Sequence, residues 1–260
     1  MPEWGFGIDT SYAQVSLEKA RELKLYGVLF AAQCLWTGAE QPATRVINLR
    51  NYHNAGIAIV GYISVASHHP GEWHVDQGRA GVPDDLWTAL RKVPIDVELT
   101  GLDYATHVVR AWDRAAALGK PQDCYTSYHA WHDLLGNPDR RPGVGLWNAY
   151  WDGDPDVDFP SLRFGRWEDN EVWAEQWSGG TNVQGVFADR NQARLDRLAI
   201  ALPPAPAPQP PTVPAPTPPP APSDAQWLGA ARILARATDL TTQRRRLTES
   251  QKAAVRFIIG

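Results

Sequence analysis

Short apolar runs alternate with longer amphipathic runs over roughly the first two hundred residues, and this alternation limits the fold more than any other feature. A strand followed by a crossover helix and a second strand is typical of a parallel sheet with helices outside it. The strand-like runs are residues 4–9, 26–33, 57–65, 92–99 and 122–127, and the helix-like runs after them are 16–27, 41–56, 83–92, 102–119 and 128–136.

Three more strand-like runs follow, at residues 144–151, 172–177 and 185–191, with no good helical pattern between them. Eight strands with five helical returns predict an α/β barrel whose last part is simplified. The length of this part is near the lower end of what a single barrel of this kind needs.

A proline-rich run, "LPPAPAPQPPTVPAPTPPPAPSDAQ", divides the chain after the predicted barrel. Because proline lacks an amide donor and restricts φ, residues 203–222 can form neither a helix nor a sheet interior, and we expect an extended spacer. The sequence therefore predicts a barrel over residues 1–202, a Pro-rich linker over 203–222 and a short helical segment over 223–260.

The C-terminal segment has the pattern of a hairpin of two short helices. Its stretches "SDAQ" and "TESQ" fit the Ser/Thr-x-x-Gln pattern of a helix start, and a turn containing "RRR" joins the two. The segment suits a solvated tail or a small hairpin that contacts another copy, and equally attachment to a polyanionic cell wall or a membrane surface. Its basic residues outnumber its acidic ones: Arg232, Arg236, Arg244, Arg245, Arg246, Lys252 and Arg256 against Asp224, Asp239 and Glu249.

Net charge excludes some partners. The formal net charge is −4 and the pI is about 6.0, so the chain as a whole does not attract nucleic acid.

The start "MPEWGFGIDT" lacks the basic and apolar regions of a secretory signal peptide, and no run approaches about 18 apolar residues. We therefore expect synthesis in the cytoplasm, at least at first.

Cysteine and tryptophan content bear on compartment and core. Cys34 and Cys124 are the only cysteines, and each lies beside strand-like sequence, so we expect buried free thiols rather than a disulfide scaffold. The 12 tryptophans suit both sugar stacking and core packing, and composition alone does not choose between these uses.

The stretch "VPIDVEL" puts two carboxylates into a run that otherwise reads as a buried strand. Side chains alternate between the faces of a strand, so Asp96 and Glu98 share a face and lie about 6.5 to 7 Å apart along it. Burial of two neighbouring carboxylates is costly because their negative charges repel each other. The repulsion is relieved when one group stays protonated and the other ionised. A raised carboxyl pKa is what a general acid needs near neutral pH.

Two further acids fall at strand ends. Asp9 is at the C-terminal end of the first strand-like run, and Asp189 is at that of the last. In a parallel barrel those ends meet at one rim, so Asp9, Asp189 and the pair Asp96 and Glu98 would converge on one cleft. Paired carboxylates in a cleft favour hydrolysis of a glycosidic bond. For any single position the alternative is a helix N-cap or a surface acid.

These residues are also those by which the sequence resembles the glycoside hydrolase family 25 lysozymes, N-acetylmuramidases of the phage endolysin and autolysin type. The resemblance covers about residues 4–192 and rests on "GFGIDTSYAQ", "IDVEL", "CYTSYHAW", "LWNAYW" and "AEQW...GVFADRN", in that order. It implies a flattened, TIM-like (β/α)5(β)3 barrel. It also implies a peptidoglycan hydrolase that cuts the β-1,4 bond between N-acetylmuramic acid and N-acetylglucosamine, with no metal or other cofactor.

The resemblance also implies roles for the four acids. Glu98 would be the general acid that protonates the leaving oxygen. Asp96 would be its partner, which orients or polarises the 2-acetamido group of the substrate or stabilises the oxocarbenium-like centre. Asp9 and Asp189 would hold the charge balance and polar groups of the substrate. Whether the nucleophile is a carboxylate or the acetamido oxygen stays open.

Aromatic residues at strand ends suggest the floor of a glycan groove. Core packing is the alternative for each of them. The candidates for contact with the substrate are Tyr62, Tyr125, Trp147, Tyr150 and Trp177.

Two polar stretches depart from the family pattern or invite a metal site. After "VGYIS" the sequence continues "VASHHPGEWHVDQGRAGVP", which we interpret as a long polar loop in solvent, because His68, His69 and His74 lack the spacing of helical zinc sites. The stretch "DGDPDVDF" at residues 152–159 lacks the glycine and closing acid of an EF-hand, which favours a surface loop at the rim of the cleft.

Three functions remain open at this stage. The first is an active muramidase that reaches bacterial peptidoglycan after holin-type release or as part of a virion. The second is a non-catalytic glycan-binding or structural module of a phage particle on the same barrel. The third is an enzyme for another polysaccharide, although the D-x-x-D-x-D-x-E run of chitinase-type barrels is absent.

Overall fold

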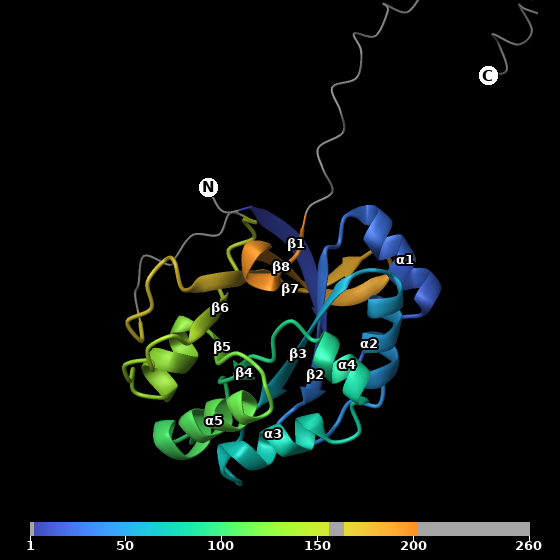
Figure 1. The fold of residues 1–260 in the computed structure, drawn as a ribbon. Coiled ribbons are helices and arrows are strands. Elements are labelled where there is room, and N and C mark those ends of the chain that lie inside the picture. Colours follow the sequence, from blue (N-terminus) through green and yellow to red (C-terminus); the bar gives the residue numbers. More distant parts are fainter. Residues whose placement is uncertain (1–2, 156–163, 202–260) are drawn as a thin grey trace, which may run out of the picture. The chain divides into compact units, whose positions relative to one another are not determined.

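The computed structural model describes residues 3–155 and 164–201, and its strands close into a barrel (Figure 1). The strands neighbour each other in chain order, which confirms the predicted (β/α)5(β)3 barrel. The predicted linker and the C-terminal helices lie outside the described residues. The strands are β1 Trp4–Thr10, β2 Phe30–Trp36, β3 Ala58–Ser64, β4 Ile95–Asp96, β5 Asp123–Thr126, β6 Gly145–Ala149, β7 Val172–Val183 and β8 Val186–Arg194.

The last strand runs against the others. Each neighbouring pair from β1–β2 to β6–β7 is parallel, whereas β8 is antiparallel to both β7 and β1. Gln184 and Gly185 join β7 to β8 with φ of 51° and 83°, and two consecutive residues with positive φ are typical of a tight hairpin turn. The prediction that Asp189 stands at the C-terminal end of its strand was therefore wrong. Asp189 lies in the first half of β8, opposite Asp9 of β1.

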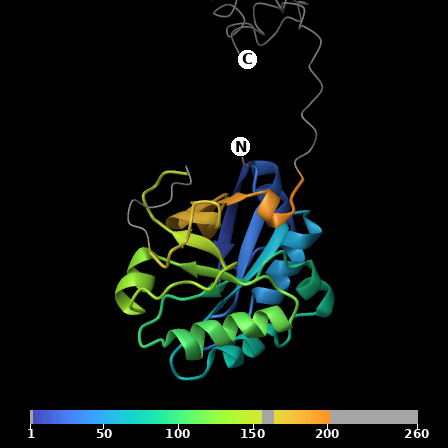
Figure 2. The same ribbon diagram turned by 60° about the vertical axis from the view of Figure 1, so that its left-hand side comes forward.

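Helices cover the outside of the barrel (Figures 1 and 2). The five predicted helix-like runs all contain helical segments, and among the described residues no helix is long and apolar enough to span a membrane. The helices are α1 Leu17–Tyr26, α2 Arg45–Asn54, α3 Gly71–Arg79, α4 Asp84–Ala89, α5 Arg110–Ala117, the π-helical turns η1 Tyr104–Val109 and η2 His129–Leu134, and the 3-10 turn η3 Asp196–Leu198.

Helix α3 corrects the interpretation of residues 65–83 as a polar solvent loop. Its His74 is fully buried, accepts a hydrogen bond from the Trp36 indole at Nδ1 (2.9 Å) and lies 2.8 Å from the Ala66 carbonyl oxygen at Nε2. Because an indole only donates, Nε2 carries the ring proton, and burial lowers the pKa of His74. A Cβ at Gly71 would lie 1.8 Å from the His107 carbonyl oxygen, so only glycine allows α3 to begin this close to η1. His74 thus ties α3 to Trp36 of β2, and Gly71 lets α3 pack closely against η1.

Apolar side chains form two layers, one between the barrel and its helices and one inside the barrel. Glycine makes room in the inner layer, since a Cβ at Gly7 would meet the Phe30 ring at 2.2 Å. The predicted buried free thiols are confirmed, because Cys34 and Cys124 are both buried and unpaired. The inner layer consists of Phe30, Ala32, Cys34, Val60, Tyr62, Tyr125, Trp147, Trp173, Ala174, Ala193 and Leu198.

Strand β4 is shorter than the predicted run over residues 92–99. It contains only Ile95 and Asp96, and Pro94, just before it, has no amide hydrogen to donate. Backbone bonds from β3 still extend along this segment, from Gly61 to the Lys92 carbonyl oxygen (3.1 Å) and from Ile63 to that of Pro94 (3.2 Å).

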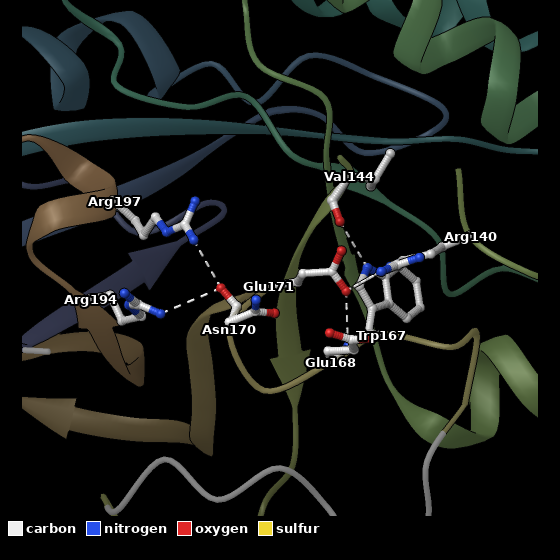
Figure 3. Close-up of polar contacts among 8 residues, drawn as sticks. All are labelled: Arg140, Val144, Trp167, Glu168, Asn170, Glu171, Arg194 and Arg197. Atoms are coloured by element: carbon white, nitrogen blue, oxygen red, sulfur yellow. Dashed lines mark hydrogen bonds and ion pairs between the residues drawn. The ribbon is translucent and has the colours of Figure 1, made fainter. Parts of the chain in front are cut away.

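Paired charges close the end of the barrel where β7 begins and β8 ends. Inside it, the Lys92 ammonium lies 2.8 and 2.9 Å from the two carboxylate oxygens of Asp123. Around it, the segment before β7 is tied down by the contacts in Figure 3. They include Arg140 Nε to Glu171 Oε2 (2.9 Å), the Glu168 amide to the same oxygen (2.9 Å), the Trp167 indole to the Val144 carbonyl oxygen (3.0 Å), and Arg194 and Arg197 to the Asn170 carbonyl oxygen (3.4 and 3.0 Å). We call this the ion-paired end.

Candidate active site

A cleft of about 360 Å³ opens at the opposite end of the barrel, where the parallel strands finish. All four acids predicted from the sequence line it, so the expected convergence of three distant chain segments is present. We call it the acid cleft. It is lined by Asp9, Ser11, Tyr12, Cys34, Thr37, Tyr62, Ser64, Asp96, Glu98, Tyr125, Trp147, Trp151, Gln176 and Asp189.

Strand register brings the acids together. Asp9 in β1 pairs across the antiparallel closure with Asp189 of β8, and Asp96 ends β4 beside Ser64 of β3. Glu98 lies two residues beyond the end of β4 and reaches solvent. A site assembled in this way depends on the closed barrel, because β1 and β8 are neighbours only after closure.

Asp96 is the most enclosed member of the predicted catalytic pair. Its side chain is 8% exposed, and Oδ2 accepts a hydrogen bond from the Ser64 hydroxyl. Burial raises the pKa of Asp96 to about 6, and the Ser64 hydrogen bond opposes that rise. Its Oδ1 is buried without a hydrogen-bond partner among the described residues.

Asp9 is also buried, with an exposed fraction of 4%. Its Oδ2 accepts hydrogen bonds from the side-chain amides of Gln176 (2.8 Å) and Asn191 (2.7 Å). Burial and then repulsion by Asp189 raise the pKa of Asp9 to about 7, while the two amides act in the opposite direction. Burial also raises the pKa of Asp189, whose Oδ1 accepts the Gly180 amide hydrogen.

Glu98 holds its proton more firmly than Asp96. Loss of water within the cleft raises the pKa of Glu98 to about 8, and repulsion from Asp96, Asp9 and Asp189 adds to the effect. Because Asp96 has the lower pKa, it ionises first as the pH rises. Near neutral pH the pair therefore contains an ionised Asp96 and a protonated Glu98. Glu98 is exposed to solvent on one side, which weakens the loss-of-water contribution and leaves repulsion from the three other acids as the second cause.

The five predicted aromatic contacts divide into two groups. Tyr62, Tyr125 and Trp147 line the acid cleft, with the Tyr62 hydroxyl 2.7 Å from Ser11 Oγ. Tyr150 is exposed and Trp177 is half-buried, and neither belongs to the cleft lining. Sugar contact by any of the five stays a prediction.

Sequence analysis missed several lining residues. Trp151 is the last residue of the strand-like run 144–151 and is 67% exposed at the edge of the cleft. Gln176 stands inside the run 172–177, where a buried polar side chain in an apolar strand was a signal of function. The others are Ser11, Tyr12, Cys34, Thr37 and Ser64.

The two polar stretches that invite a metal site, at residues 65–83 and 152–159, were interpreted from sequence as loops. In the described part of the chain no group of three or more His, Cys, Asp or Glu side chains could hold a metal ion. His74 uses both ring nitrogens in the contacts described above. In the stretch 152–159, Asp152 accepts the Asp154 amide hydrogen (2.9 Å), and residues 156–159 lie outside the described ranges.

The fold resembles solved lysozymes and an endolysin. A family GH25 lysozyme from Aspergillus fumigatus matches with a TM-score of 0.60 at 16% identity, over 76% of this chain and 100% of that chain. The lysozyme from Streptomyces coelicolor matches with 0.62 at 21% identity, over 76% and 96%. The catalytic domain of endolysin ply40, from bacteriophage P40 of Listeria monocytogenes, matches with 0.53 at 12%, over 75% and 96%.

No protein-family model and no curated protein matches the sequence. At the identities found, the likeness establishes architecture. The chain has a barrel of the glycoside hydrolase family 25 type, as its sequence motifs imply.

Proposed function

We propose that this chain is a peptidoglycan hydrolase that cleaves the β-1,4 bond between N-acetylmuramic acid and N-acetylglucosamine. The observation that carries the proposal is the acid cleft, where Asp9, Asp96, Glu98 and Asp189 line one opening. The higher pKa of Glu98 than of Asp96 favours a protonated Glu98 beside an ionised Asp96. The likeness to solved structures of lysozymes and an endolysin supports the same class of substrate.

In this proposal Glu98 acts as general acid. Its position past the end of β4 gives its carboxyl access to a glycosidic oxygen that enters from solvent. Proton transfer from Glu98 to that oxygen would break the bond as positive charge develops on the anomeric carbon. A raised pKa suits this step because the proton is still present at neutral pH.

Asp96 supplies the complementary negative charge. Its Oδ2 is held by the Ser64 hydroxyl, its buried Oδ1 has no hydrogen-bond partner among the described residues, and the residue lines the cleft. There it would either hold the N–H of the 2-acetamido group, so that the acetamido oxygen attacks, or stabilise the oxocarbenium-like centre directly. Asp9 and Asp189, on the other side of the cleft, would bind polar groups of the substrate.

Loss of turbidity of isolated peptidoglycan tests the proposal. Replacement Glu98→Gln keeps the size of the side chain and removes the transferable proton, so clearing should slow by about 10²-fold or more. The matched control is Glu22→Gln on α1, where the carboxylate pairs with Lys19 away from the cleft, and its clearing rate should equal that of the native chain. Equal clearing by Glu98→Gln contradicts the role of Glu98.

The products identify the bond. Cleavage by a muramidase leaves N-acetylmuramic acid at the new reducing end, which borohydride reduction followed by acid hydrolysis would reveal as muramitol. Glucosaminitol instead would mean that the other glycosidic bond is cut. Tight binding to peptidoglycan without clearing by the native chain would favour the glycan-binding module.

A further inference from the structure

A single amide side chain connects the aromatic edge of the acid cleft to two of its acids. Gln176 of β7 is buried, and its Oε1 accepts hydrogen bonds from the Tyr125 hydroxyl (2.9 Å) and the Trp151 indole Nε1 (2.7 Å). Its Nε2 donates to Asp9 Oδ2 (2.8 Å) and to Asp189 Oδ2 (3.3 Å). All four hydrogen-bonding positions of this amide are therefore used.

The chemistry of the partners determines which way the amide of Gln176 points. An indole N–H can only donate, so the amide oxygen has to face Trp151. The flipped amide would set its N–H groups against the indole N–H and its oxygen against the carboxylates of Asp9 and Asp189. The observed orientation is thus the one in which both amide hydrogens point at acids.

Asn191 of β8 has the same kind of contacts, with an indole on its amide oxygen and an acid on its amide nitrogen. The indole Nε1 of Trp147 donates to Asn191 Oδ1 (2.9 Å), and Asn191 Nδ2 donates to Asp9 Oδ2 (2.7 Å). One oxygen of Asp9 therefore receives two amide hydrogens, each directed by a different indole. Trp147 is buried, but Trp151 is 67% exposed and lines the cleft. The Gln176 arrangement therefore ends on a well-exposed indole, whereas the indole of the Asn191 arrangement is buried although it lines the cleft.

We propose that Gln176 is a positioning residue that stabilises the ionised forms of Asp9 and Asp189 and couples them to the orientation of the Trp151 indole. A sugar ring that stacks on the exposed face of Trp151 would hold the indole N–H on Gln176, and Gln176 would then hold the two acids for the same glycan. This coupling to a glycan rests on the proposed function. The effect of Gln176 on the acids does not depend on it.

Carboxyl-carbon NMR titration of the full chain tests the inference without any substrate. In Gln176→Leu, Asp9 loses one of two charge-stabilising hydrogen bonds, so its midpoint should rise by about one pH unit. In Trp151→Phe an aromatic ring remains at this position but the indole N–H is lost. The Gln176 side-chain amide resonances should move and the Asp9 midpoint should rise by less, because Tyr125 still donates to Oε1.

The matched control is Gln192→Leu, the same replacement on the opposite face of β8 from Asn191. It should leave the Asp9 midpoint in place. An unchanged midpoint in folded Gln176→Leu overturns the inference. If that variant does not fold, Trp151→Phe decides, since its exposed side chain can be changed without loss of the core. In that case the inference is overturned if Trp151→Phe changes neither the Gln176 side-chain amide resonances nor the Asp9 midpoint.

Kinetics separate this inference from the proposed function. On peptidoglycan, Gln176→Leu should lower kcat and move the acid limb of the pH profile upward with the Asp9 midpoint, whereas Trp151→Ala should mainly raise KM. A merely structural role of Gln176 would lower the amount of folded protein without moving that limb. If the native chain does not hydrolyse peptidoglycan, the proposed function fails, and the NMR midpoints still decide the role of Gln176.

Discussion

The two ends of the barrel treat carboxylates in opposite ways. At the ion-paired end, Asp123, Glu171 and Asp196 each have a cationic partner, in Lys92, Arg140 and Arg194. In the acid cleft, no ion pair to any of the four acids is found among the described residues.

This difference separates groups that hold the fold from groups poised for chemistry. A cation beside a carboxylate lowers its pKa and neutralises it, which suits a structural role. Carboxylates that are crowded and dehydrated without a cation keep protons near neutral pH, at the expense of stability. The ion-paired end therefore stabilises the barrel. In the acid cleft, repulsion and loss of water keep carboxyl protons in place near neutral pH, which suits proton transfer.

The largest expected effect comes from breaking the buried pair at the ion-paired end. In Asp123→Asn the Lys92 ammonium stays buried without its carboxylate, and the free energy of unfolding should fall by about 3–5 kcal/mol. Denaturant unfolding measures this. Asp84→Asn, which breaks an exposed pair with Arg79, serves as control and should cost at most about 0.5 kcal/mol. Similar losses in both variants would contradict the structural role of the Lys92–Asp123 pair.

The pH dependence of the free energy of unfolding tests the raised pKa values in the acid cleft. Asp9 and Asp96 have pKa values of about 7 and 6 in the folded chain, against 3.8 ordinarily. Between these values the folded state binds more protons than the unfolded state. The free energy of unfolding should therefore fall as the pH rises from about 4 to about 7, by about 1.4 kcal/mol for each pKa unit of difference.

Urea unfolding at a series of pH values measures that slope, and Asp9→Asn should flatten it. A chain that becomes more stable between pH 4 and 7, as expected when carboxylates are ion-paired, would contradict the raised pKa values. Such a result would also remove the contrast between the two ends.

Replacement of Glu98, the acid of the cleft that reaches solvent, should have a smaller effect on the free energy of unfolding. At pH 9 Glu98 is ionised beside Asp96, Asp9 and Asp189, and Glu98→Gln removes this repulsion. Because the side chain reaches solvent, the gain should be no more than about 1 kcal/mol. At pH 5, where Glu98 is protonated, the gain should vanish. A loss of stability at pH 9 would mean that Glu98 serves the fold rather than proton transfer.

The smallest effect is expected from removal of the C-terminal part. Truncation after Leu202 should leave the barrel folded, with a free energy of unfolding within about 0.5 kcal/mol of the full chain and hydrolysis of soluble glycan fragments unchanged. Scanning calorimetry checks the first point. Loss of cooperative melting would refute the predicted division of the chain into separate domains.

Local patterns in the sequence were enough to predict the presence of the eight strands and the five helical returns, and to nominate Asp9 and Asp96. Asp9 and Asp96 could be nominated because a charged residue in an apolar strand contradicts its surroundings, and such a conflict is detectable within a few residues. Helix α3 escaped prediction because its stability comes from tertiary contacts of His74 and Gly71. Local propensity does not register contacts of that kind.

The sequence by itself therefore determined most of the strands and helices and nominated Asp9 and Asp96 as inward-facing acids, since side-chain periodicity is a property of neighbours in the chain. Only the tertiary structure decided that β8 runs antiparallel, that Asp189 meets Asp9, and that the amide of Gln176 faces both acids. The contacts of Asp9 with Asp189 and Gln176 join residues more than a hundred positions apart, and the closed barrel is what brings such residues together.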